Sequence, residues 1–371
     1  MGGVQAFRKL TTQVCSFHVR DRFWGRLPSN QLGDLDTMRA AVLRRAKGKL
    51  ELEDRALPVP GHGEVLIRIR ACGICHGDLM VQNGDFPFVR FPIVPGHEIT
   101  GVVESVGAGV DHPKPGARVG VPWLFSACGH CKYCILGDEI LCVAGQYVGM
   151  TRDGGYQEFM VARADYVLPL PDSLGFADAA PLMCAGLSVY SGLSHAGFRP
   201  GDKVAVVGLG GLGNLAVLFA RAMGGRVAVV SSTRGKEAQA RELGAERFIY
   251  TGAGSAGEAL GAWDGGADII LQVAPSLESA NAAFPGLAPD GTFVLLAPVP
   301  VAVDHFALCL RRQRLMGSSS GSRKELRATL DLAAVHGIRP QLKCFPLSKA
   351  DEALAELEST RPAGRMAVVM D

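Results

Sequence analysis

The most informative stretch of the chain reads Lys203-Val-Ala-Val-Val-Gly-Leu-Gly-Gly-Leu-Gly213. Its first five residues form an apolar run of the kind that builds a parallel strand buried on both faces. The glycines that follow, spaced G-x-G-x-x-G, allow a tight turn, close approach of the backbone to a pyrophosphate, and close packing of a helix on a strand. The turn follows a strand and opens a helix, whose free N–H groups attract anions. We therefore interpret it as a dinucleotide-binding loop made of Gly208, Leu209, Gly210, Gly211, Leu212 and Gly213; a plain structural turn is the alternative.

Strand and helix patterns alternate around this loop. Helices are expected at 212–223 and 236–243, and strands at 226–230, 268–273 and 292–296. Such alternation is typical of a doubly wound α/β domain with a parallel sheet.

The residues before about 186 have a β-rich pattern. Short strands are predicted at 65–70, 102–107 and 117–121, and frequent glycine and proline predict many turns between them. A helix at 349–357 and a strand at 365–369 end the chain, and we expect this tail to return to the first domain.

The composition is that of an ordinary globular protein. The 371 residues suffice for two domains, and 48% of them are hydrophobic while 20% are charged. The net charge of +2 gives no reason to expect a nucleic-acid partner or an anionic membrane. No apolar run is long enough to span a bilayer. Residues 1–37 are rich in arginine, which fits a targeting peptide or, as we favour, an extension before a working start at Met38.

Ten cysteines in a chain of this size, without an obvious signal peptide, favour metal binding over a disulfide framework. Four of them follow the spacing C-x2-C-x2-C-x7-C: Cys128, Cys131, Cys134 and Cys142. Four thiolates satisfy Zn²⁺ completely and leave no position for a substrate. We therefore predict a structural zinc in this segment.

Three further candidate ligands are dispersed along the chain, namely Cys75, His97 and Cys184. Two thiolates and one imidazole leave a fourth coordination position open, which is the arrangement of a catalytic zinc that polarises a substrate oxygen. Spacing alone only suggests this set, since a buried cysteine or histidine is often just a packed core residue.

The end of the second predicted strand of the dinucleotide domain bears on cofactor choice. NAD enzymes usually carry an acidic residue there for the ribose 2′-hydroxyl. Here the acidic residue is missing, and hydroxyl and cationic side chains take its place: Ser231, Ser232, Thr233, Arg234 and Lys236. These groups favour a 2′-phosphate, so we predict NADP(H) over NAD(H). A solvated helix start is the alternative for Arg234 and Lys236.

From about Met38 to the C-terminus the chain resembles the zinc-containing medium-chain alcohol dehydrogenase family, including its cinnamyl-alcohol-type and yeast-type branches. The elements that match, in the family's order, are Gly73-Ile-Cys75-His76, Gly96-His97-Glu98, the segment Cys128–Cys142, Cys184 and the loop Gly208–Gly213. The resemblance implies a GroES-like β-rich catalytic domain, formed by 38–185 and 323–371, and a Rossmann domain, formed by 186–322. The active site would lie in the cleft between them.

The resemblance also implies roles for individual residues. Cys75, His97 and Cys184 would bind the catalytic zinc, and Glu98 would be the adjacent carboxylate that can approach the metal during ligand exchange. Asp78 would orient His97, and His76 would contact a cofactor phosphate.

The chain departs from the family at the proton relay. The family usually has Ser or Thr two residues after the first zinc-ligand cysteine, and often a histidine three residues further on. Here these positions hold Gly77 and Met80, neither of which can transfer a proton.

We therefore expect a cytoplasmic NADP(H)-dependent zinc alcohol dehydrogenase or aldehyde reductase, with two zinc ions per chain and a small alcohol or aldehyde as substrate. One alternative is a reductase of the C=C bond of α,β-unsaturated carbonyl compounds, which would suit a site without a relay. Another is a cofactor-binding sensor that has lost turnover. The resemblance further implies a homodimer or homotetramer.

Overall fold

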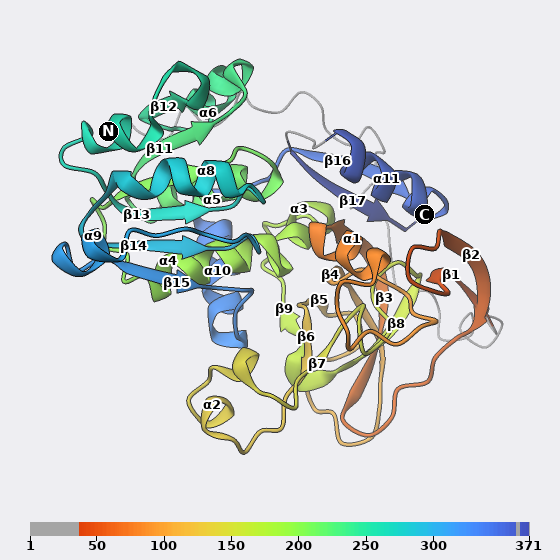
Figure 1. The fold of residues 1–371 in the computed structure, drawn as a ribbon. Helices are drawn as coiled ribbons and strands as arrows, with labels where there is room; N and C mark the ends of the chain where they lie inside the picture. The colour runs from red at the N-terminus through yellow and green to blue at the C-terminus, as the bar shows by residue number, and fades with distance from the viewer. Residues whose placement is uncertain (1–36, 361–363, 371) are drawn as a thin grey trace.

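The computed structural model describes residues 37–360 and 364–370 (Figure 1). Residues 1–36, which make up nearly all of the predicted extension, lie outside the described residues. The strands are β1 (Thr37–Leu43), β2 (Leu50–Ala56), β3 (Glu64–Ile74), β4 (Glu98–Val106), β5 (Arg118–Val121), β6 (Leu124–Ser126), β7 (Gln146–Tyr147), β8 (Phe159–Arg163), β9 (Leu168–Pro169), β10 (Lys203–Val207), β11 (Arg226–Ser231), β12 (Arg247–Tyr250), β13 (Ala267–Gln272), β14 (Leu287–Leu295), β15 (Arg314–Gly317), β16 (Leu342–Pro346) and β17 (Arg365–Val369).

The α-helices are α1 (His76–Asn83), α2 (Lys132–Ile135), α3 (Phe176–Ala179), α4 (Ala185–His195), α5 (Gly211–Ala222), α6 (Glu237–Glu242), α7 (Ala256–Gly261), α8 (Leu277–Ala283), α9 (His305–Leu310), α10 (Arg323–His336) and α11 (Ala350–Thr360). The 3-10 helices include η3 (Glu139–Leu141), η5 (Ala180–Met183) and η6 (Arg234–Lys236).

The second half of the chain forms a parallel sheet of six strands in the order β12-β11-β10-β13-β14-β15. The strand order reverses between β10 and β13, and at such a point the loops after the two strands leave a crevice for a ligand. The glycine-rich loop follows β10 at this crevice. The fold is therefore the Rossmann type that the sequence predicts.

The apolar run of β10 is buried on both faces of this sheet because side chains alternate along a strand. Val204 and Val206 join the core that contains α4, α5 and α10. Ala205 and Val207 join a second core, which includes the fully buried Trp263, on the opposite face. Helices therefore cover both faces of the sheet, as a parallel sheet requires.

The first half forms a largely antiparallel sheet in the order β16-β17-β3-β4-β5-β9, with β8 also paired to β3. The last strand, β17, pairs with β3, so the tail (blue in Figure 1) lies beside the N-terminal strands. This sheet encloses its own core, which includes Ile67, Ile99 and Val368.

The structure has the predicted elements, although most of their ends are shifted by one to five residues. Strands β10 and β17 begin and end at the predicted residues, whereas β4 and β14 begin four and five residues earlier than predicted. Helix α10 was not predicted; it packs on α4, and its Leu326 and Leu330 belong to the core of the parallel sheet. The domain limits at 185 and 323 stay predictions. Within the described ranges, no helix has the length and apolar character needed to cross a membrane.

Candidate active site

The carboxylate of Asp78 connects the first two candidate metal ligands. Cys75 directly precedes α1, and its backbone N–H donates to Asp78 Oδ2 at 2.9 Å, which caps the helix. The other oxygen, Oδ1, lies 2.9 Å from Nδ1 of His97. An aspartate at Nδ1 fixes the imidazole so that Nε2 is left for a metal.

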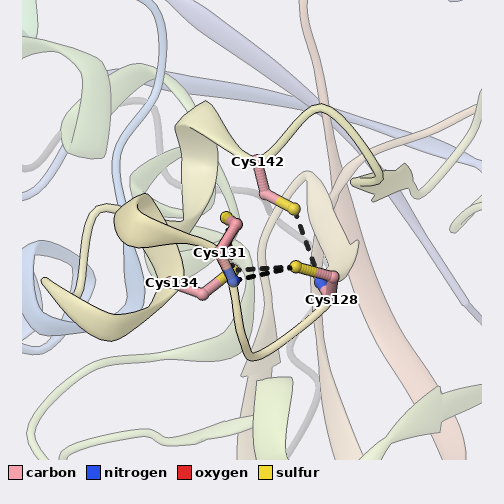
Figure 2. A group of neighbouring side chains, drawn as sticks. All are labelled: Cys128, Cys131, Cys134 and Cys142. Atoms are coloured by element: carbon pink, nitrogen blue, oxygen red, sulfur yellow. Dashed lines mark hydrogen bonds between the residues drawn. The ribbon is translucent and has the colours of Figure 1, made fainter.

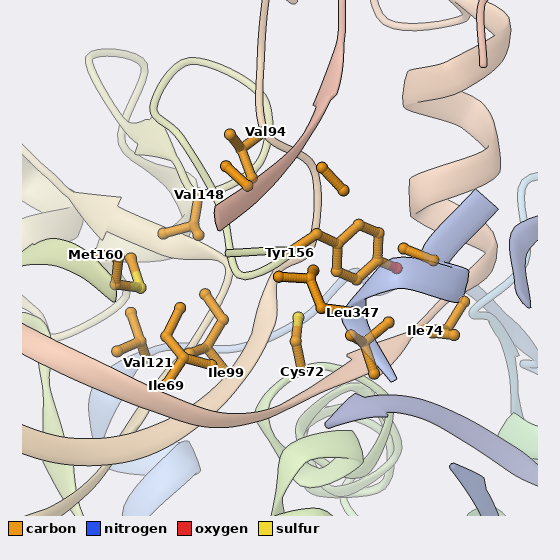
Figure 3. Packing of buried hydrophobic residues seen from close by; sticks show 14 of the residues in the cluster. Ile69, Cys72, Ile74, Val94, Ile99, Val121, Val148, Tyr156, Met160 and Leu347 are labelled. Carbon is orange, nitrogen blue, oxygen red and sulfur yellow. The ribbon is translucent and has the colours of Figure 1, made fainter. Parts of the chain in front are cut away.

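Asp78 is itself held by further donors from the core. The backbone N–H of Gly96 donates to Oδ1 at 3.2 Å, and the hydroxyl of Tyr156 donates to Oδ2 at 3.0 Å. Figure 3 shows Tyr156 among apolar side chains that include Val94, Cys72 and Leu347. Burial raises the pKa of Tyr156 well above its usual value, so the phenol stays protonated and keeps donating. Sequence reasoning missed Tyr156 because it is 78 residues from Asp78 in the chain.

Cys184 is the remaining candidate ligand, and it comes from a different segment of the chain. It lies between η5 and α4, and the structure brings the ligand atoms of Cys75, His97, Glu98 and Cys184 within 4.8 Å of one another. A hydrogen bond with the Cys184 thiol lowers the pKa of Cys75 well below its usual value; burial opposes this effect and His97 reinforces it. Two sulfurs, an imidazole and a carboxylate, with one thiolate already favoured, fit the chemistry of a zinc site.

Glu98 is paired with a residue that the sequence analysis missed. Arg365, the first residue of β17, reaches Oε1 and Oε2 of Glu98 at 2.6 and 2.5 Å, and the pair is buried. The backbone N–H of Ala185 also donates to Oε1 at 3.3 Å. Burial raises the pKa of Glu98 to about 8, although the Arg365 guanidinium opposes that shift.

Arg365 also contacts the glycine-rich loop. A Cβ on Gly211 would lie 2.8 Å from Cδ of Arg365, so the loop and the arginine are in direct contact. Among the described residues, Nε of Arg365 has no hydrogen-bond partner. The arginine therefore joins the candidate metal site to the candidate dinucleotide site, with one buried N–H left to donate.

The glycines of the loop are required for different reasons. Gly208 has φ of +104°, and a Cβ on Gly213 would overlap the carbonyl oxygen of Gly208. A Cβ on Gly210 would meet nothing among the described residues within 4 Å. The turn thus needs Gly208 and Gly213 for its own geometry, while Gly210 faces open space where a ligand could approach.

The side chains of residues 231–236, which are predicted to select the cofactor, have different surroundings. Ser232, Thr233 and Arg234 are exposed, and Ser231 is buried with its Oγ accepting the backbone N–H of Thr233 at 3.1 Å. The ammonium of Lys236 instead donates to the carbonyl of Leu209 at 2.8 Å. Lys236 therefore braces the glycine-rich loop in this structure.

The structure does not bring His76 into the ligand group; it is the exposed first residue of α1. Gly77 follows it, and a Cβ there would lie 3.0 Å from Cε1 of His97. The ring of His97 therefore occupies the space beside the position where the family usually carries a hydroxyl.

The other four cysteines lie together in a separate lobe, defined as residues 128–142 and built around α2 and η3 (Figure 2). The ligand atoms of Cys128, Cys131, Cys134 and Cys142 are within 4.8 Å of one another. The backbone N–H groups of His130 and Cys131 lower the pKa of Cys128 to about 6, which favours the thiolate. Four sulfurs at these distances suit a closed tetrahedral site.

Comparison with known proteins agrees with this geometry. The family model described as "Alcohol dehydrogenase GroES-like domain" matches residues 61–172, and that described as "Zinc-binding dehydrogenase" matches residues 211–335. An alcohol dehydrogenase of Geobacillus stearothermophilus is 39% identical over 337 residues, which cover 90% of this chain and all of that protein. The chain belongs to the zinc-containing medium-chain alcohol dehydrogenase family.

Solved structures show the same relationship. A cinnamyl alcohol dehydrogenase from Sorghum bicolor has a TM-score of 0.82 and 32% identity, covering 90% of this chain and 97% of that one. A structure titled CAD from Helicobacter pylori, complexed with NADP(H), has a TM-score of 0.79 and 26% identity, covering 90% and 98%. Both family resemblance and fold class are thereby confirmed, and the family supports zinc and a nicotinamide nucleotide as cofactors.

The two glycines with different surroundings give a paired test of the loop. Gly213→Ala places a methyl group against the Gly208 carbonyl, so we expect a lower melting temperature and weaker binding of a nicotinamide nucleotide. Gly210→Ala should keep the parental melting temperature yet raise the Kd by about tenfold, because its methyl group enters the space predicted for the pyrophosphate. Thermal unfolding and calorimetric titration with NADPH measure both; equal Kd values for Gly210→Ala and parent would contradict the assignment of the loop.

Proposed function

We propose that the protein is a zinc-dependent alcohol dehydrogenase that works chiefly as an NADPH-linked aldehyde reductase. The observation that carries the proposal is the contact of Arg365 with both Glu98 and Gly211. This one side chain links Glu98, which belongs to a group of four residues of zinc-ligand type, to the glycine-rich loop. A site of this composition can hold a carbonyl oxygen and a hydride donor side by side.

In this proposal Cys75, His97 and Cys184 hold the catalytic zinc, and Glu98 stands ready as an alternative ligand. The lobe of Cys128, Cys131, Cys134 and Cys142 holds the second ion. When bound, the catalytic zinc supplies a Lewis acid that polarises the substrate oxygen, and the nicotinamide supplies the hydride. The balanced reaction is an aldehyde, NADPH and a proton giving a primary alcohol and NADP⁺.

The chain's own residues prepare this reaction. Asp78 orients the imidazole of His97, and Arg365 holds the carboxyl group of Glu98 beside the other candidate ligands. The free Nε–H of Arg365, beside the glycine-rich loop, is suited to a phosphate of the cofactor. Closure of the two units around the substrate would exclude water from the reacting atoms.

The exposed side chains after β11 support NADP(H) as the preferred cofactor. Ser232, Thr233 and Arg234 present hydroxyls and a guanidinium to solvent with no carboxylate in that segment. Lys236 contributes positive charge nearby while it braces the loop. A 2′-phosphate would gain charge-assisted hydrogen bonds at this position.

Reduction of a C=C bond in an unsaturated carbonyl compound stays the second candidate, and one observation favours it. The ring of His97 lies close to Gly77, so the usual relay hydroxyl is not merely absent; it has little room. A reaction that adds its proton at carbon does not need a relay from the substrate oxygen to solvent.

We also propose that the protein is a homodimer or homotetramer. Among the described residues, strand β15 ends the parallel sheet with one unpaired edge, and Leu315 on it and Phe306 and Leu310 on α9 are exposed. An unpaired edge can pair with another chain, and exposed apolar side chains beside it support such a contact. Sedimentation equilibrium measures the state, and a monomer at micromolar concentration would contradict the proposal.

The function is tested by oxidation of NADPH and of NADH by the zinc-loaded protein, with saturated, aromatic and α,β-unsaturated aldehydes and with product identification. We expect primary alcohols as products and faster turnover with NADPH. Products in which only the C=C bond is reduced would replace the main proposal with the second candidate. No turnover with any carbonyl compound would favour a cofactor-binding sensor.

The cofactor preference has a test of its own. Arg234→Asp puts a carboxylate where the 2′-phosphate is predicted, so the Kd for NADPH should rise by about 10- to 100-fold while the Kd for NADH changes little. Arg241→Asp, a charge change of the same size on the neighbouring helix α6, is the control. Equal effects of the two variants on NADPH binding would mean that the preference was misassigned.

A further inference from the structure

The lobe of residues 128–142 is fastened to the beginning of α10, far away in the chain. Asp138 accepts from the ammonium of Lys324 at 2.7 Å, and Glu139 accepts from Nε of Arg323 at 2.7 Å. The backbone N–H of Ile140 donates to the hydroxyl of Ser322 at 3.4 Å. Three successive residues of the lobe thus meet three successive residues at the start of the helix.

The contact of Glu139 is the most specific of the three. Its side chain is 4% exposed, and Oε1 also accepts the backbone N–H of Arg323 at 3.1 Å. The carboxylate therefore satisfies one of the free N–H groups in the first turn of α10 and sits at the positive end of the helix dipole. Arg323 is held further by the carbonyl of Asp165 at 2.7 Å and by the ring of Tyr166, whose centroid lies 4.5 Å from Cζ.

Helix α10 is in turn tied to α4. Glu325, in the first turn of α10, lies 2.7 Å from Nε2 of His195, at the end of α4. Just before α10, the backbone N–H of Ser320 donates to the hydroxyl of Ser188, near the start of α4, at 3.1 Å. Leu326 of α10 and Leu187 of α4 belong to the same buried core. The two helices therefore behave as one packed unit.

Helix α4 begins directly after the candidate zinc ligand Cys184. The backbone N–H of Ser188 donates to the carbonyl of Cys184 at 2.7 Å, and that of Ala185 donates to Glu98. A displacement of α4 therefore displaces the Cys184 thiol relative to Cys75 and His97. An unbroken series of contacts leads from the lobe through α10 and α4 to the catalytic ligand.

The lobe has little apolar packing of its own to keep its shape. Of its large aliphatic side chains, Ile135, Leu136 and Leu141 are 72%, 68% and 56% exposed, and that of the adjoining Val143 is 98% exposed. Only Ile140 is half-buried. A segment that buries so little apolar surface depends on a cross-link for its conformation, and a tetrahedral metal supplies one. The position of Glu139 therefore depends on the metal in the lobe.

We propose that the lobe positions Cys184: Glu139, held in place by the lobe metal, anchors Arg323 and so fixes α10 and α4, and loss of this anchor loosens the zinc at the catalytic site. The inference rests on the proposed function, because it takes both cysteine sites as zinc sites. Glu139 and Arg323 are positioning residues; neither belongs to the catalytic ligand group.

The test is the rate of zinc release from the purified holoenzyme, followed with a chromophoric chelator. In Cys184→Ser the catalytic site loses a ligand, so the release phase that stays unchanged in this variant belongs to the lobe. In Glu139→Gln the catalytic phase should become about tenfold faster than in the parent, which is the size of effect expected when a group supporting a metal ligand is removed. Absorption of the cobalt-substituted catalytic site should also shift, since Cys184 moves relative to the ion.

Glu246→Gln is the matched control. Glu246 is likewise held by an arginine, Arg226, with contacts of 2.7 and 2.8 Å, but it is exposed and directly precedes β12, the edge strand of the parallel sheet. The Glu246→Gln variant should release the catalytic zinc at the parental rate, even if its melting temperature falls as much as that of Glu139→Gln. If both variants release the catalytic zinc at the parental rate, or both release it equally faster, the proposed anchor is wrong.

A second variant covers the case in which Glu139→Gln does not fold. His195→Gln removes the contact of the imidazole with Glu325 at the far end of the same series of contacts, from an exposed position, and should also speed the catalytic phase. Parental release from this variant would overturn the inference. A purified protein with zinc in neither site would overturn the proposed function itself, whereas two zinc ions with unchanged release would overturn the inference alone.

Discussion

The carboxylate of Asp78 receives hydrogen bonds from segments that are far apart in the chain. It accepts from the backbone of Cys75 and of Gly96, from the ring of His97 and from the hydroxyl of Tyr156. Each of these donors would cost free energy if it were buried without a partner. One side chain thus caps α1, fixes the start of β4 and orients the imidazole, and the relative position of the candidate ligands Cys75 and His97 follows from it.

The pair of Glu98 and Arg365 adds a second constraint, within the largely antiparallel sheet that contains β4 and β17. A buried ion pair gives little net stability, because both groups lose their hydration. Its role here is positional, because it holds the carboxyl group of Glu98 beside the side chains of Cys75, His97 and Cys184. Since Arg365 also touches Gly211, the candidate metal site and the glycine-rich loop share one cation. The relative position of these two sites therefore depends on this arginine.

The parts that could be predicted from sequence are those encoded by local pattern. The buried run of β10 and the four-cysteine spacing each specify their structure within a few neighbouring residues. Arg365 and Tyr156 could not be found in this way, because their partners lie 267 and 78 residues away and each looks like an ordinary strand or core residue. Helix α10 could have been found, since Ser322 and Glu325 form a readable capping box. Lys236 has the predicted charge, but its contact with the carbonyl of Leu209 depends on the loop's three-dimensional path.

Gly77 shows how geometry changes the meaning of a sequence difference. From sequence it is a relay residue that has been lost, and restoring a hydroxyl would be the natural experiment. In the structure a Cβ at this position lies 3.0 Å from the ring of His97, closer than ordinary van der Waals contact. A threonine there would press on a zinc ligand as well as add a proton donor, so a change in products could not be assigned to the relay. Direct identification of the products of the unmodified protein separates the carbonyl and C=C reactions without that ambiguity.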